Sequence, residues 1–352
     1  MSAEKICLED VACPLCQSRK GRQLFTGTDR LHRRDGRFAV SECLACGFRF
    51  TNPRPTRESM VHYYPNDYGP YRGFTPTGVE LFADGVSFFS RLKNELKAMV
   101  LRRHYAYRLE NAPAGNGLLE ILPRSFAASL ERAACRLFQI RNPRIPLYRD
   151  GGMALDIGCG NGHYLLFLKE LGWEPAGFDI ANNVAAAVTE AGIPIYTGSI
   201  DGLQAQAGSF ELITMWHALE HLHDPVGDLR SIYRLLANGG KLLIEVPNSD
   251  SIAAKLFRSD WFQWDLPRHL SHFTPESLVR LLEIVGFRVN HLTHLHKTTL
   301  PDTLRYWFET HKRPGMLGAP HQESRWCRWV RMLGYPLRWC RSGENILVGA
   351  AK

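Results

Sequence analysis

The sequence predicts an α/β fold in which a mostly parallel, seven-stranded sheet carries helices on both faces. One pattern in the sequence supports this prediction. From residue 152 onward, short apolar runs alternate with stretches of helical periodicity, and strands separated by helices form βαβ units with parallel strands. A cysteine-containing segment and then a mostly helical insert precede this region. We therefore expect three parts, at residues 1–71, 72–150 and 151–352.

Seven apolar runs are the expected strands. In order they read MALDIG, EPAGFDI, IPIYTG, FELITMW, GKLLIEVP, RVNHLTHL and ENILVGAAK. HYLLFLKELGW, directly after the first run, and LPDTLRYWFETH, between the last two, predict helices. Thr274 followed by Pro275 predicts another helix start, because Thr caps a helix and Pro suits its first turn.

The insert holds two predicted helices. Apolar residues recur at helical spacing beside a basic face over residues 85–110, and residues 124–141 form a second such run before the prolines of NPRIP. A basic amphipathic helix fits attachment to an anionic membrane surface. A lid or a dimer interface has the same periodicity, so these alternatives stay open.

Composition narrows the cellular setting and the partners. No run approaches the roughly 18 apolar residues of a membrane span, and the N-terminus lacks a secretory layout, so we expect a cytoplasmic protein. The net charge of +8 suits an anionic partner, whether nucleic acid, phosphorylated metabolite or membrane. In a reducing compartment the cysteines outside the two C-x-x-C pairs are expected to be free thiols: Cys7, Cys135, Cys159, Cys327 and Cys340.

Two C-x-x-C pairs predict a metal site near the N-terminus. CPLC contains Cys13 and Cys16, and CLAC contains Cys43 and Cys46. Four thiolates complete the tetrahedral shell of structural zinc and leave no open position for chemistry. Redox activity is the competing interpretation, but neither pair opens a helix in a βαβ unit.

The loop LDIGCGNG predicts a ligand site at the end of the first strand of the sheet. Gly158, Gly160 and Gly162 let the backbone approach a ligand closely, and the following helix offers free N–H groups to a carboxylate. Asp179 ends the next strand, where a carboxylate can accept hydrogen bonds from both ribose hydroxyls. Neither a dinucleotide fingerprint nor a phosphate loop is present.

LDIGCGNG, FDI, FELITMWHALEH and LLANGGKLLIEVPN together resemble class I S-adenosylmethionine (SAM)-dependent methyltransferases, which have a Rossmann-like fold, over about residues 152–290. The resemblance implies that Asp156 and the loop hold the methionine end, Asp179 the ribose and Ile180 a face of the adenine. Trp216 and His217, at the end of the fourth strand, would border the methyl donor. Many relatives carry Asp where this chain has Gly198, Ser199 and Ile200, so Ser199 or Asp201 is expected at the adenine amino group. The implied cofactor residues are Asp156, Gly158, Cys159, Gly160, Gly162, Asp179, Ile180, Ser199, Ile200 and Trp216.

The N-terminal pattern resembles a second, narrower group. CPLCQS, CLACGFRFTNPRP and YYPNDYGPY are similar to the zinc ribbon of methyltransferases that act on sugars and other small secondary metabolites. Some of those enzymes methylate carbon on nucleotide-linked keto-sugars. This sequence lacks the second nucleotide-fold domain of the longer sugar enzymes, so the C-methylation subtype stays open.

A histidine cluster follows the fourth predicted strand. On a helical turn His217 and His221 would share one face, with Glu220 nearby, at the strand ends where α/β sheets bind ligands. Our hypothesis is that His221, oriented by Glu220, removes the acceptor's proton and that His217 lines the pocket. It also rests on the Glu-His pair of related sugar methyltransferases. Alternatively, EHLHDP caps a helix and anchors a loop.

Two further groups could touch the substrate or simply pack. Aromatic rings beside a guanidinium suit a planar or anionic substrate, and tyrosine could supply a hydroxyl group. These groups are Trp261, Trp264, Arg268, His269 and His272, and Tyr63, Tyr64 and Tyr68.

The expected function is SAM-dependent methyl transfer to a small acceptor such as a sugar, nucleotide-sugar, glycan precursor or secondary metabolite. Basic residues between the cysteine pairs leave RNA methylation as an alternative, although few aromatic residues there could stack on bases. A non-catalytic SAM-binding module is the third possibility, but such a module has no need of the histidine cluster. The acceptor atom and the oligomeric state are not determined by the sequence.

Overall fold

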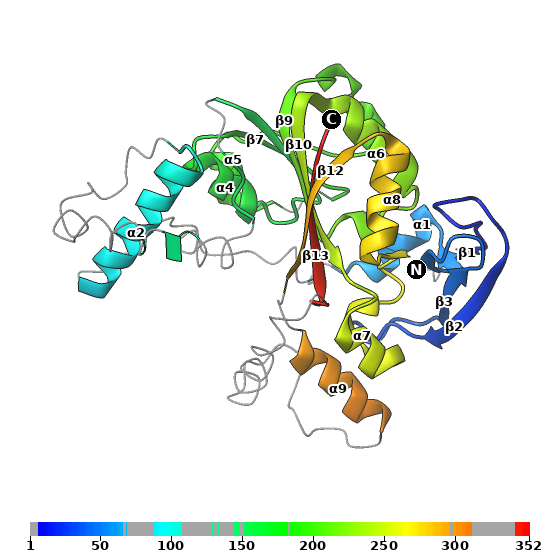
Figure 1. Cartoon of the computed structure of the whole chain (residues 1–352). Coiled ribbons are helices and arrows are strands. Elements are labelled where there is room, and N and C mark those ends of the chain that lie inside the picture. Colours follow the sequence, from blue (N-terminus) through cyan, green and yellow to red (C-terminus); the bar gives the residue numbers. More distant parts are fainter. Residues whose placement is uncertain are drawn as a thin grey trace. The chain divides into compact units, whose positions relative to one another are not determined.

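The computed structural model describes residues 6–65, 68, 88–107, 129, 132–133, 135, 144–147, 151–181, 184–295, 299–311 and 342–352. Figure 1 draws the chain with colours that follow the sequence. By its internal contacts, the chain divides into two compact units. The first unit is Met1–Gly69 with Gly198–Lys352, and the second is Pro70–Thr197. The predicted boundaries near residues 71 and 150 stay predictions.

All seven predicted strands form, in one sheet of order β12-β13-β10-β9-β6-β7-β8. Of the described pairings, β6 with β7, β7 with β8 and β9 with β10 are parallel, and β13 is antiparallel to β10 and β12. The predicted α/β class with a mostly parallel sheet is therefore confirmed. The strands are β6 (Met153–Ile157), β7 (Glu174–Phe178), β8 (Ile195–Tyr196), β9 (Phe210–Trp216), β10 (Leu236–Pro247), β12 (Arg288–Leu295) and β13 (Asn345–Ala351).

The second unit alternates strands and helices as predicted. β6 is followed by α4 (His163–Glu170), and β7 by α5 (Ala186–Glu190). Leu165 of α4 is fully buried against Val188 of α5. The predicted helix at 85–110 is α2 (Phe88–His104), whereas the one predicted at 124–141 lies mostly outside the described residues.

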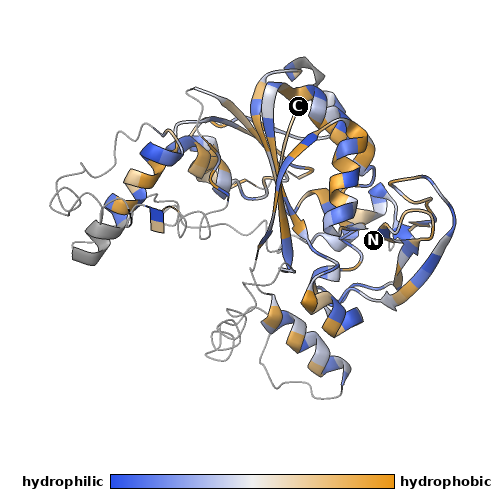
Figure 2. Cartoon of the chain, in the orientation of Figure 1, coloured by the Kyte–Doolittle hydropathy of each residue, from blue (hydrophilic) through white to orange (hydrophobic). Residues whose placement is uncertain are grey.

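In the first unit, α6 (Pro225–Leu235) packs against α8 (Pro275–Val285). α8 begins as predicted: Thr274 Oγ1 accepts a hydrogen bond from the Ser277 N–H (3.2 Å), and Ser277 Oγ accepts one from the Thr274 N–H (2.9 Å). Apolar and polar residues alternate around this helix in Figure 2, as expected when one face is buried. Its other described α-helices are α7 (Ile252–Phe257), α9 (Leu300–Thr310), which was also predicted, and the short α1 (Arg57–Met60).

The cysteine-bearing segment forms a small antiparallel sheet of order β11-β4-β3-β2. The strands are β2 (Gly21–Gly27), β3 (Phe38–Cys43), β4 (Arg49–Thr51) and β11 (Ser271–His272), while β1 (Leu8–Glu9) pairs separately with β5 (Arg54–Pro55). Since β11 lies more than 200 residues after β4, the N-terminal segment shares its sheet with the C-terminal half of the chain.

Two remaining expectations concern cysteines and membranes. Cys7, Cys135 and Cys159 form no disulfide among the described residues, and Cys327 and Cys340 lie outside them. Within the described part of the chain, every helix is too short or too polar to cross a bilayer.

Candidate functional site

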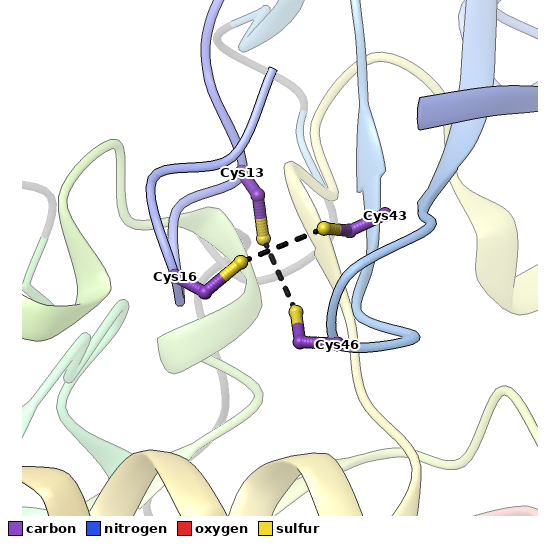
Figure 3. A group of neighbouring side chains, drawn as sticks. All are labelled: Cys13, Cys16, Cys43 and Cys46. Carbon is purple, nitrogen blue, oxygen red and sulfur yellow. Dashed lines mark hydrogen bonds between the residues drawn. The ribbon is translucent and has the colours of Figure 1, made fainter. Parts of the chain in front are cut away.

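The four cysteines of the C-x-x-C pairs converge at one point (Figure 3). Cys13 and Cys46 Sγ lie 3.6 Å apart and Cys16 and Cys43 Sγ 3.5 Å apart. All four sulfurs lie within 4.8 Å of one another. Sulfurs bound to one zinc ion at about 2.3 Å lie about 3.8 Å apart. The thiols therefore have the spacing that a tetrahedral zinc ion requires.

The surroundings of these thiols differ. Burial raises the pKa of Cys13, and raises that of Cys46 to about 11. Burial also acts to raise the pKa of Cys43. Hydrogen bonds from the backbone N–H groups of Ala45 and Cys46 and from the Cys16 thiol outweigh this effect and lower the pKa to about 7. Cys43 is therefore partly thiolate at neutral pH, the form that binds metal.

In the second unit, the glycine loop closes onto Asp179. The Gly160 N–H donates to Asp179 Oδ2 (2.8 Å), and the Ala181 N–H donates to Oδ1 (3.1 Å). Gly158, Gly160 and Gly162 have φ of 76°, 52° and 80°, the left-handed conformation that suits glycine. Burial raises the pKa of Asp179 and these N–H groups oppose it.

The neighbours of Asp179 are consistent with a bound nucleoside. Asp156 and Cys159 are buried, and burial raises the pKa of the Cys159 thiol. Ile180 is 66% exposed, so it presents an apolar surface beside the carboxylate. An exposed Ile beside this carboxylate is the arrangement predicted for an adenine face.

The positions predicted near the adenine amino group are partly occupied by other contacts. Asp201 accepts hydrogen bonds from Ser231 and from Arg234 (2.9 Å to the latter). Ser199 Oγ accepts one from the Gly202 N–H (3.3 Å), and Ile200 is buried. The adenine contact therefore stays a prediction.

In the first unit, His217 lies between two buried carboxylates. Its Nδ1 is 3.2 Å from Glu220 Oε1 and its Nε2 3.1 Å from Glu245 Oε1. Asn345 Nδ2 donates to the same Glu245 oxygen (2.8 Å). Burial lowers the pKa of His217, but the two carboxylates outweigh it and raise the pKa to about 9. His217 is therefore positively charged at neutral pH.

His221 does not have the predicted surroundings. The expected helical face shared with His217 is wrong: His217 has φ of 55°, and only the 3-10 turn η5 (Leu219–His221) follows. His221 Nδ1 lies 3.0 Å from the Arg268 carbonyl oxygen and 2.8 Å from the Tyr64 hydroxyl oxygen. Glu220 instead hydrogen-bonds His217. Burial lowers the pKa of His221 to about 4, so its imidazole is neutral.

The downstream aromatic segment packs, and its arginine is not available to a substrate. Arg268 is fully buried and pairs with Asp29 (2.8 Å) and Asp265 (2.6 Å). These carboxylates hold the pKa of Arg268 above its ordinary value despite burial. Trp261 and Trp264 are buried in the core. The packing alternative is therefore correct for these residues.

Of the three candidate tyrosines, two pack and one contacts the histidine cluster. The Tyr63 hydroxyl donates to the Asp35 carbonyl oxygen (2.8 Å), and the ring of Tyr68 packs edge-on against that of Tyr64. Tyr64 alone of the three brings its hydroxyl to His221. The Thr51 hydroxyl donates to the His269 carbonyl oxygen (2.7 Å).

Glu245 and Asn345 were not predicted as site residues. Glu245 is 1% exposed and Asn345 2% exposed. A carboxylate within the otherwise apolar run LLIEVP is the one signal in the sequence for Glu245. No local pattern marks Asn345, since it reaches the cluster only through the pairing of β13 with β10.

Residues 126–292 match a family model described as "Methyltransferase domain". This region, slightly less than half of the chain, is therefore similar to methyltransferase domains. A ubiquinone biosynthesis O-methyltransferase of Xanthomonas oryzae pv. oryzae is 30% identical over 132 residues, which cover 35% of this chain and 55% of that protein. One from Pseudomonas aeruginosa is 25% identical over 183 residues, covering 46% and 79%.

The match to the Xanthomonas relative thus spans little more than half of that protein. Among solved structures, a SAM-dependent methyltransferase from Archaeoglobus fulgidus is similar with 22% identity and a TM-score of 0.42, covering 62% of this chain and 94% of that one.

Proposed function

We propose that this chain is a SAM-dependent methyltransferase that acts on a small acceptor. The observation that carries the proposal is the glycine loop closed onto Asp179, within a region that matches a methyltransferase domain. Both carboxylate oxygens of Asp179 keep lone pairs beyond the backbone hydrogen bonds and can accept from ribose hydroxyls. Ile180 would cover the adenine.

The loop residues would hold the methionine end of SAM. Because Gly158, Gly160 and Gly162 carry no side chain, the backbone of the loop can approach the ligand closely. The loop lies beside the N-terminus of α4, which favours the carboxylate. The buried Asp156 would accept a hydrogen bond from the amino group. Cys159, Ser199, Ile200 and Trp216 remain predicted residues of the donor site.

Methyl transfer needs an aligned acceptor and the loss of its proton. A bond forms between the acceptor atom and the methyl carbon while the sulfur–methyl bond breaks, its electron pair staying on sulfur. We place the acceptor's reacting group at the cluster of His217, Glu220 and His221. The neutral His221 offers a nitrogen lone pair there, which can accept the acceptor's proton. Glu220 does not orient this ring through a hydrogen bond, contrary to the hypothesis from the sequence.

The acceptor class rests on two supports. Ubiquinone biosynthesis O-methyltransferases, to which the chain is similar, are named for a small-molecule pathway. The N-terminal cysteine pattern resembles that of sugar and secondary-metabolite methyltransferases, which favours a sugar-like acceptor. The RNA alternative is weakened because Arg22 and Arg30 of the N-terminal segment are ion-paired with Glu42 and Asp260.

We also propose that Cys13, Cys16, Cys43 and Cys46 bind a structural zinc ion. Their sulfur spacing supports this assignment. Bound there, the ion would join the two turns that carry the cysteines and so stabilise the small sheet.

Calorimetric titration of SAM and its demethylated product into the zinc-loaded protein tests the proposal. Asp179→Ala should weaken binding at least about 100-fold, because each hydrogen bond to a charged group contributes about 1.5–3 kcal/mol. Asp250→Ala, which removes an exposed carboxylate paired with Lys255, is the matched control and should bind normally. A wild-type protein that binds neither ligand would sink the proposal.

A further inference from the structure

Three side chains in the first unit converge like the ligands of a cation. A carboxylate oxygen of Glu220, a ring nitrogen of His221 and a ring nitrogen of His269 lie within 4.8 Å of one another. Glu220 is fully buried and His269 is 8% exposed. The Leu270 N–H donates to the Glu220 carbonyl oxygen (2.8 Å), which holds the two segments together. The four-cysteine site does not involve these residues.

The hydrogen bonds of both histidines fix where their lone pairs are. His269 Nδ1 lies 2.9 Å from the Gln263 carbonyl oxygen, and His221 Nδ1 lies 3.0 Å from that of Arg268. A carbonyl oxygen only accepts, so the proton of His269 lies on Nδ1 and its Nε2 keeps a lone pair in the neutral ring. His221 Nδ1 also lies 2.8 Å from the Tyr64 hydroxyl oxygen; with the proton on Nδ1, as the Arg268 carbonyl requires, this hydroxyl oxygen accepts as well and His221 Nε2 keeps its lone pair. Metal-binding histidines are held in the same way, by a backbone carbonyl on the other ring nitrogen.

Glu220 has one engaged and one unengaged oxygen. Its Oε1 is 3.2 Å from His217 Nδ1. Its Oε2 is buried and has no hydrogen-bond partner within the described ranges of the chain. Leaving a buried carboxylate oxygen unsatisfied is unfavourable, so this atom calls for a ligand.

The atoms around His269 Nε2 also favour a bound positive charge. Glu220 Oε1 lies 4.0 Å away and Asp265 Oδ2 3.8 Å away. A nitrogen lone pair flanked by two carboxylates is repelled unless a proton or a metal cation lies among them. The unengaged Glu220 oxygen and the oriented His221 ring favour the metal, because a proton on His269 would satisfy neither.

We propose that Glu220, His221 and His269 bind a divalent transition-metal cation such as Zn²⁺. Two imidazoles and one carboxylate form a recognised zinc ligand set, and three protein ligands leave a position open. The site thus differs from the four-cysteine cluster, which is filled by its own ligands.

The chemical role of this cation rests on the proposed function, although its binding does not. An acceptor oxygen in the open position would have its pKa lowered, so its proton would pass more readily to solvent. This favours an acceptor with a hydroxyl or enol oxygen. His221 then serves as a metal ligand, and Tyr64, hydrogen-bonded to it, helps to position it.

The test is the zinc content of the full-length protein at equilibrium with excess Zn²⁺, measured as ions per chain. The wild type should hold two ions. Glu220→Gln and His269→Gln should each hold one, while His291→Gln, which changes an exposed histidine of β12, should hold two. Circular dichroism checks that each variant is folded.

Cobalt substitution of the wild type is a second readout that needs no variant. A chelator should remove the cobalt bound to nitrogen and oxygen and leave the thiolate–cobalt absorption of the four-cysteine site unchanged, since that site is closed. One zinc ion per wild-type chain, or two in both Glu220→Gln and His269→Gln, would overturn the proposal. The positive charge in the cluster would then be a proton and not a metal ion.

The two proposals fail separately. A chain that holds two zinc ions but does not bind SAM would contradict the proposed function alone. A chain that transfers methyl with one zinc ion, at a rate that a chelator does not change, would contradict the cation site alone.

Discussion

His217 carries a strained backbone at the end of β9. Its φ of 55° is a left-handed conformation that costs a non-glycine residue on the order of 1 kcal/mol or more. Hydrogen bonds to Glu220 and Glu245 hold the ring in place despite that cost. Strain maintained by buried polar partners is common at functional sites, which agrees with the proposed role of this cluster.

Asp228, in the first turn of α6, provides a prediction about pH. Burial raises its pKa to about 6, with the charges of Asp224 and Asp201 acting in the same direction and Arg57 against them. The folded protein thus binds this proton more tightly than the unfolded chain. The free energy of unfolding should therefore fall as pH rises from about 4 through 6.

We expect Asp228→Asn to raise the free energy of unfolding by up to about 1 kcal/mol at pH 7, after allowance for solvent screening. At pH 4 the difference should vanish. Urea unfolding at both pH values measures it, with Asp250→Asn as an exposed control. An equal gain at pH 4 would mean that ionisation of Asp228 is not the cause.

At the scale of elements, the turn from β6 into α4 depends on close approach to α5. Gly162 directly precedes α4 with φ of 80°. A Cβ at this position would lie 2.6 Å from Val188 Cγ2. The turn therefore requires glycine for its conformation and for its packing.

Gly162→Ala should lower the free energy of unfolding by about 2–4 kcal/mol, the sum of left-handed strain and overpacking. Gly192→Ala is the matched control: its φ is 67°, but no atom lies within 4 Å of its added Cβ. It should cost only about 1–2 kcal/mol. Denaturant unfolding of both variants gives the comparison, and equal costs would contradict the role of Val188.

At the scale of the whole molecule, the N-terminal segment is built into the first unit. β4 pairs with β11, Arg268 pairs with Asp29, and the Thr51 hydroxyl donates to the His269 carbonyl oxygen. These contacts link the four-cysteine sheet to the segment that carries His269. Loss of the proposed zinc ion should therefore destabilise the first unit as a whole and not the four-cysteine sheet alone.

Chelation strong enough to empty the four-cysteine site should lower the midpoint of a single unfolding transition in the first unit. The near-ultraviolet signal of the buried Trp261 and Trp264 reports it. Cys16→Ser should have the same effect, and Cys7→Ser, outside the cluster, should not. A separate early transition that leaves the tryptophan signal unchanged would instead show an independent ribbon domain.

Local patterns predicted the elements because each depends on neighbouring residues. Apolar runs marked all seven strands, and Thr274 with Pro275 marked the start of α8. The spacing of Cys13, Cys16, Cys43 and Cys46 predicted their convergence, because each pair forms its own turn. His217 and His221 were misassigned because helical spacing says nothing about a residue with positive φ.

The sequence by itself determined the sheet, the glycine loop with Asp179, and the four-cysteine cluster, since periodicity and short-range spacing encode them. Only the tertiary structure decided that Glu220 pairs with His217, that Arg268 is neutralised by Asp29, and that His269 faces Glu220. The last two contacts join residues 239 and 49 positions apart. Such pairs arise from how packed segments meet, and no local pattern of residues records that.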